Sequence, residues 1–146
     1  MASYMDKQRL PSGEEVWRCD KGELHIRFPA PGIVEFQCIG HFTPDFADMA
    51  GDPITRARES APHIFIFVDC DQMTGYDSAF RTKVTDRLRI HGKRTRLPIT
   101  FLVRSKLLAM GITVASVALR GTPRVYSERE EYNRVKEAAI KKARPR

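Results

Sequence analysis

The 146-residue sequence predicts an α/β domain with a mixed sheet, a parallel βαβ second half and helices mainly on one face. Three observations lead to this fold class. Residues 64–68 form a short apolar run rich in β-branched and aromatic side chains, which is typical of a strand buried on both faces. Helix and strand patterns alternate after this run, which favours parallel strands joined by right-handed crossovers. The first 40 residues instead show short strands and turns, as in an antiparallel meander.

The first half of the chain is expected to supply the antiparallel strands. Residues 1–13 carry no clear periodicity and are predicted to be a flexible N-terminus. A first strand is predicted around Val16 and Trp17. Apolar and polar residues then alternate over 24–28 and again over 33–39, which is the period of a half-buried strand. The intervening prolines and glycine predict a turn between these two strands.

The segment from Thr43 to Asp45 predicts the start of a helix. Thr is a common N-cap, Pro fits the first helical turn, and an acidic residue there interacts favourably with the helix dipole. The Gly and Pro residues at 51–53 are expected to interrupt this helix, which resumes over 54–59. The central apolar strand follows and is predicted to end at Asp69, where a polar loop begins.

The second half is predicted to continue as alternating helices and strands. Apolar residues at helical spacing follow Asp77 and Ser78, and indicate an amphipathic helix. We place a single domain at 14–140 and a basic tail at 141–146. The later elements are a helix from Ser78 to Gly92, a strand over 98–103, a helix begun by Ser105, a strand over 124–126, and a helix opened by a capping box at 127–130.

Composition narrows the classes of function. No apolar run approaches the ~20 residues of a membrane span, and the first residues lack the apolar core of a signal peptide, so we expect a cytoplasmic protein. The three cysteines are far apart, which favours reduced thiols over a disulfide framework or a zinc site. The net charge of +7 is concentrated at 93–96 and 141–146, but no nucleic-acid motif accompanies it, so nucleic-acid binding is a minor alternative.

No pattern predicts catalysis. The four histidines are scattered, and none lies at a recognisable spacing from a nucleophile. The glycines form no phosphate-binding loop. We therefore expect a protein that is not an enzyme and holds no cofactor and no metal.

The central stretch resembles the STAS domain, the fold of anti-sigma-factor antagonists and of the cytoplasmic domains of sulfate transporters. In that family an apolar strand ends in Asp, and Asp-Ser opens a helix after a short loop. Here Val68 and Asp69 end the strand, and Asp77 and Ser78 follow with the same spacing. The order of elements fits over roughly residues 15–140. The residues around this motif depart from the family pattern, because Ala79 and Phe80 replace the usual Ser-Gly and Thr74 to Tyr76 replace apolar residues. These departures resemble the divergent SEC14-like branch.

The resemblance implies a regulatory protein-interaction module whose partner is an anti-sigma factor or a kinase-like regulator. It makes Ser78 the expected phosphoacceptor, and a helix N-terminus tolerates a phosphate because free N–H groups and the dipole favour an anion. The alternative that Asp77 or Ser78 is only an N-cap stays open. So do a small-ligand or lipid carrier and a homodimer.

Other polar residues are expected near Ser78, because loops after parallel strands open at one edge of the sheet. Asp69 would hold its loop by accepting backbone N–H bonds. The predicted site loop contains Asp69, Asp71, Thr74, Gly75 and Asp77, and neighbouring loops contribute Thr43, Arg104 and Ser105.

Overall fold

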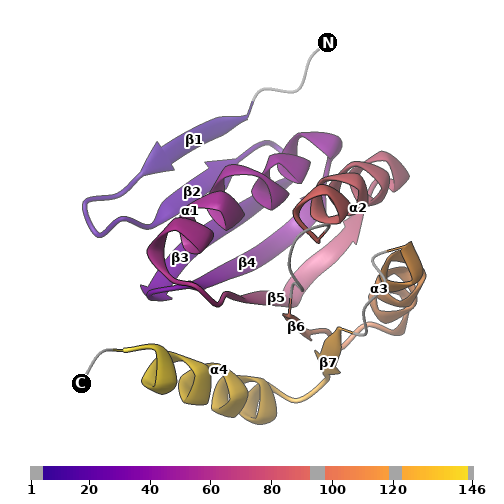
Figure 1. Ribbon diagram of the computed structural model, residues 1–146. Helices are drawn as coiled ribbons and strands as arrows, with labels where there is room; N and C mark the ends of the chain where they lie inside the picture. Colours follow the sequence, from indigo (N-terminus) through magenta and orange to yellow (C-terminus); the bar gives the residue numbers. More distant parts are fainter. Residues whose placement is uncertain (1–4, 93–97, 119–122, 145–146) are drawn as a thin grey trace.

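A computed structural model of the chain describes residues 5–92, 98–118 and 123–144. Two further sequence predictions lie outside these residues: the basic segment at 93–96 as a loop, and Gly121 as the end of the helix begun by Ser105. In this described part of the chain, seven strands form one sheet in sequence order, antiparallel from β1 to β4 and parallel from β4 to β7, which confirms the mixed sheet (Figure 1). The strands are β1 (Asp6–Arg9), β2 (Glu15–Arg18), β3 (Gly22–Ala30), β4 (Ile33–Phe42), β5 (Phe65–Tyr76), β6 (Ile99–Leu102) and β7 (Arg124–Tyr126).

Helices cover both faces of the sheet, but most lie on one. A 3₁₀ helix, η1 (Pro44–Ala50), and the helices α1 (Asp52–Ser60), α2 (Ser78–Gly92) and α3 (Lys106–Ala118) pack on the first face. The last helix, α4 (Arg129–Ala143), packs on the second face, and Figure 1 shows it on the opposite side of the sheet from α1 and α2. The expectation of helices mainly on one face is confirmed.

Two apolar cores follow from this arrangement. The larger core lies between the sheet and the helices η1, α1 and α2, where rings of Phe42, Phe46 and Phe80 pack against one another. The smaller core lies under α4. Its fully or nearly buried members are Ile33, Phe67, Leu102, Tyr132 and Ile140. Strand alternation in β5 supplies both cores, since Ile66 and Val68 face the first and Phe67 faces the second.

The strand β5 is longer than the sequence predicts. It continues past Asp69 to Tyr76, so Asp71, Thr74 and Gly75 lie in a strand and not in the predicted site loop. The reason is the partner strand, because β4 pairs with β5 from Ile33↔Phe65 to Phe42↔Tyr76. Register shifts in this pairing absorb extra residues of β5 and let its polar second half stay hydrogen-bonded.

Three further segments differ from the sequence prediction. Residues 6–9, expected to be flexible, form the edge strand β1, because their backbone pairs with β2 although their side chains are polar. The predicted capping box is wrong, since Glu128 is the N-cap of α4 and makes no side-chain capping bond. The helix also continues into the predicted basic tail, where Lys141 and Lys142 form its last turn and complement the negative end of the dipole.

Candidate functional site

The structure divides the predicted site residues into two groups. We call the first the α2 start: His41, Asp77 and Ser78, at the far end of the β4–β5 pair. We call the second the acid–arginine cluster: Asp69, Asp71, Arg104 and Arg129. Asp69 and Tyr76 lie seven positions apart along β5, which separates the groups by roughly 20 Å, at ~3.3 Å a residue. The sequence predicted a single site, and the extension of β5 is the reason that there are two.

The α2 start is fixed by backbone hydrogen bonds. The Asp77 N–H donates to the Phe42 carbonyl at 2.9 Å, and the Asp77 carbonyl accepts from Phe80 N–H at 3.0 Å. Asp77 therefore occupies the N-cap position, and Ser78 is the first residue of α2, with an exposed side chain. Of the two N-cap alternatives, the backbone geometry selects Asp77, and the Ser78 hydroxyl lies outside the cap position.

A histidine that the sequence analysis treated as scattered belongs to the α2 start. His41 Nε2 lies 2.7 Å from Asp77 Oδ1, and both side chains are about two-fifths exposed. Gly75 lies beside the imidazole, since a Cβ there would approach His41 Nδ1 to 3.3 Å. Thr43 begins η1 close by, but its hydroxyl is buried without a hydrogen-bond partner among the described residues. Thr74 is exposed on β5.

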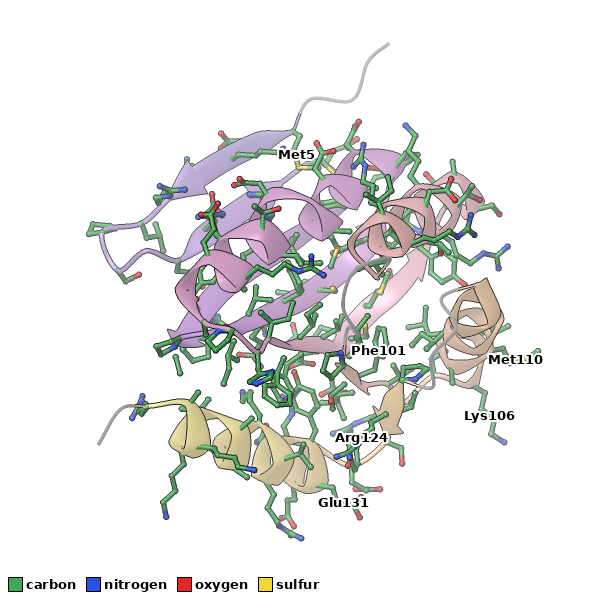
Figure 2. All side chains as sticks on the ribbon, in the orientation of Figure 1. Met5, Phe101, Lys106, Met110, Arg124 and Glu131 are labelled. Atoms are coloured by element: carbon green, nitrogen blue, oxygen red, sulfur yellow. The ribbon has the colours of Figure 1, made fainter. Side chains whose placement is uncertain are left out.

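The middle of α3 lies against the end of β5. A Cβ at Gly111 would come within 1.9 Å of the Tyr76 hydroxyl oxygen, so only glycine allows this contact. One turn earlier and next to this glycine, Leu107 and Met110 are 79% and 65% exposed. Figure 2 shows Met110 and Lys106 pointing away from the body of the protein. We call Leu107 and Met110 the α3 apolar surface. Tyr76, which contacts α3 at Gly111, directly precedes Asp77 of the α2 start.

The acid–arginine cluster is a compact set of ion pairs on the second face. Arg129, at the start of α4, donates to both oxygens of the buried Asp69 carboxylate at 2.7 and 3.2 Å, and to Asp71 at 3.1 Å. Hydrogen bonding to Asp69 is the main reason that the pKa of Arg129 is raised. Arg104 contacts the other oxygen of Asp71 at 2.9 Å. As predicted, Asp69 accepts a backbone N–H, that of Asp71 at 3.1 Å.

A second buried polar group lies under the same helix. The Tyr132 hydroxyl donates to Glu35 at 3.1 Å, and the Lys136 ammonium contacts the same carboxylate oxygen at 2.8 Å. Burial, and then the charge of Glu35, raises the pKa of Tyr132 well above its usual range. Both polar groups pair α4 with the sheet, so we assign them to holding α4 in place.

The sequence offered little to find these partners. Arg129 lies 60 residues after Asp69, and Glu35 was placed on the polar face of its predicted strand. Ser105, by contrast, begins α3 as predicted, with its hydroxyl 3.4 Å from the Leu108 N–H and its carbonyl accepting from Ala109.

Two shallow clefts on the described part of the surface are lined mostly by charged or polar residues. One, of about 360 Å³, lies between β1, β2 and the start of α1, and includes Lys7, Glu15, Asp48 and Trp17. The other, of about 310 Å³, lies beside the acid–arginine cluster and is lined by Arg104, Ser127 and Glu128. In residues 5–92, 98–118 and 123–144, no group of three or more His, Cys, Asp or Glu side chains is placed to hold a metal ion. No helix in these ranges is long and apolar enough to cross a membrane.

Comparisons with known proteins identify the fold. No protein-family model matches the chain, and no curated protein matches it in sequence. An uncharacterised protein of the DUF3478 family from Shewanella loihica PV-4, with a SpoIIAA-like fold, matches in structure with a TM-score of 0.53 and 11% identity, over 92% of this chain and 93% of that one. The anti-sigma factor antagonist SpoIIAA, in its unphosphorylated form, matches with a TM-score of 0.57 and 13% identity, over 80% of this chain and 97% of that one. The chain therefore has a STAS-like fold.

Proposed function

We propose that this chain is a regulatory protein-interaction module of the anti-sigma-factor-antagonist type. Its partner would be an anti-sigma factor or a kinase-like regulator, and the proposal places the chain in the cytoplasm and assigns it no catalytic step. The proposed docking surface combines the α2 start with the α3 apolar surface. The likeness of its fold to SpoIIAA supports the class of function, and the geometry of Ser78 supports the location.

The observation that carries the proposal is the position of Ser78. Its side chain is exposed at the first position of α2. The backbone around it is fixed by the backbone hydrogen bonds of Asp77 to β4 and to α2. A modifying enzyme can therefore reach the hydroxyl without unfolding the domain. A partner that covers α2 would also meet this side chain at a defined point.

A phosphate at Ser78 would change the surface more than the fold. It adds about −1.5 to −2 charges at pH 7, and the free N–H groups of the first helical turn accommodate an anion. It would stand next to Asp77, whose carboxylate is already paired with His41. The added charge would change the surface that a partner meets there, and would oppose a partner that has a carboxylate or an apolar side chain at this point.

The α3 apolar surface supports a protein partner over a small ligand. Two large apolar side chains that remain mostly in water are unusual on one helix turn, and a covering partner would bury them. A lipid carrier should instead contain a deep apolar pocket. The two clefts described above are shallow and lined mostly by charged residues.

Affinity capture from a lysate of the source organism tests the proposal. The baits are the wild-type chain, Ser78→Asp, Met110→Ser and Ser127→Asp, which places the same charge on an exposed serine before α4. We expect a regulatory protein that wild type and Ser127→Asp retain and that both other baits lose. Light scattering on the purified chain distinguishes such a partner from a second copy of this chain.

Two results would contradict the proposal. One is a partner retained equally by all four baits, which would move the docking surface elsewhere. The other is native material in which Ser78 carries no phosphate under any growth condition while the partner still binds and dissociates. The second result would leave an interaction module but remove Ser78 as its switch.

A further inference from the structure

Two of the three cysteines meet in the middle of the sheet. Cys38 in β4 and Cys70 in β5 are 2% and 7% exposed, and both belong to the larger core. Their strands are adjacent and parallel, with Gln37 paired to Asp69 and Ile39 paired to Gln72. Cys38 therefore faces the first of the two places where β5 carries an extra residue.

The geometry of this register shift brings the two thiols together. Adjacent strands lie ~4.8 Å apart, and a disulfide needs Cα atoms ~4.4–6.8 Å apart. Both side chains point to the same face of the sheet, since both pack in the larger core. A hydrogen bond between the two thiols is the largest of the effects that raise the pKa of Cys38, followed by burial.

We propose that Cys38 and Cys70 are a redox pair that a small neutral peroxide converts into a reversible disulfide. The geometry that supports this assignment is the register shift, which places both thiols on one face of adjacent strands. The inference does not depend on the proposed function. Burial explains why the oxidant must be small and neutral, and why the thiols stay reduced until the core opens locally.

The chemistry balances with one peroxide for each disulfide. With hydrogen peroxide as the oxidant, the Cys70 sulfur, on the more exposed side chain, attacks one peroxide oxygen. The O–O bond breaks, the thiol proton goes to the departing oxygen, and a sulfenic acid forms as the first water leaves. The Cys38 thiol then attacks that sulfur, the S–S bond forms, and a second water leaves. Two thiols lose two hydrogens and two electrons, and a thiol reductant restores them. The neighbouring Cys38 is what diverts Cys70 from irreversible oxidation to sulfinic acid.

The cross-link would fix the part of the sheet that leads to the α2 start. Beyond the two cysteines, β4 and β5 continue side by side to His41↔Gly75 and Phe42↔Tyr76. A covalent bond at the register shift holds this pairing in one arrangement. The proposal therefore connects an oxidant to the position of α2 through the backbone of two strands.

Peptide mapping of the full chain after peroxide treatment tests the proposal. Samples of wild type, Cys19→Ser, Cys38→Ser and Cys70→Ser are oxidised in native buffer, alkylated and digested without reductant. The masses of the peptides are then measured by mass spectrometry. We expect a linked Cys38–Cys70 peptide pair, lighter by two hydrogens, in wild type and in Cys19→Ser only. Adding a thiol reductant before alkylation should remove it. Cys19 is the matched control, because it is half-buried and lies outside the pair.

Two controls use only the wild-type chain, so they do not depend on whether the serine variants fold. These controls are oxidation in urea and alkylation of the folded protein. Links that form in urea but not in native buffer would overturn the proposal, because the native geometry would then not favour the bond. So would native oxidation that converts Cys70 to sulfinic acid while Cys38 stays free. A native link that involves Cys19 would overturn it as well.

Discussion

Removing Arg129 should destabilise the domain through the carboxylate that it leaves behind. In Arg129→Ala, the Asp69 side chain keeps only the Asp71 N–H as a hydrogen-bond partner among the described residues, although Asp69 is 6% exposed. Removing one member of a buried ion pair costs about 3–5 kcal/mol. Because the arginine side chain is 35% exposed, water can reach part of the vacated space, and we expect a loss of about 2–3 kcal/mol.

Urea denaturation followed by circular dichroism measures this loss. Arg104→Ala is the matched control, since it removes one of the two arginine partners of Asp71, and the Arg104 side chain is itself 61% exposed; it should cost about 1 kcal/mol or less. Arg129→Lys keeps the charge but loses the forked contact with both oxygens, so it should fall between the two. Equal losses for Arg129→Ala and Arg104→Ala would refute the view that Asp69 is a buried charge held by α4.

The remaining predictions concern the smaller core under α4 and the two ends of this helix. Phe67→Ala should cost about 3–5 kcal/mol in urea denaturation, because Phe67 is buried and packs edge-on against Tyr132; a loss under 1 kcal/mol would mean an open sheet face. The raised pKa of Tyr132 contributes stability that is complete below its unfolded value of ~10 and is lost as the pH rises further. Melting temperatures measured across this range should fall less steeply in Tyr132→Phe, and parallel curves would contradict this. A chain ending at Ile140 loses the last turn of α4 and should lose only about 1 kcal/mol, since Lys141 and Lys142 are exposed; failure to fold would contradict it.

The fold was predictable where burial leaves a periodic pattern. The apolar run at 64–68 identified the central strand, and its alternation with helical patterns identified the parallel half of the sheet. The edge strand β1 was not predictable, since its exposed side chains are polar and only backbone pairing makes it a strand. The second half of β5 was missed for a similar reason. It carries polar residues and Gly75, and it is a strand because its backbone pairs with the long strand β4.

The candidate site was predictable only in part. Local sequence identified Ser78 and Asp77, because a helix start has its own pattern. It could not show that His41 contacts Asp77, since that contact depends on how far β4 runs beside β5. The pairing of Asp69 with Arg129 depends on α4 crossing the second face of the sheet, and no local sequence pattern predicts that crossing.

The affinity of the captured partner for the chain phosphorylated at Ser78, compared with the unmodified chain, tests the account most directly. Both forms can be separated from one preparation, so folding and concentration are matched. The account predicts that phosphorylation weakens binding about tenfold or more, which corresponds to ~1.4 kcal/mol, and that melting temperature is unchanged. Equal affinities for the two forms would contradict the claim that the α2 start is a regulated docking surface.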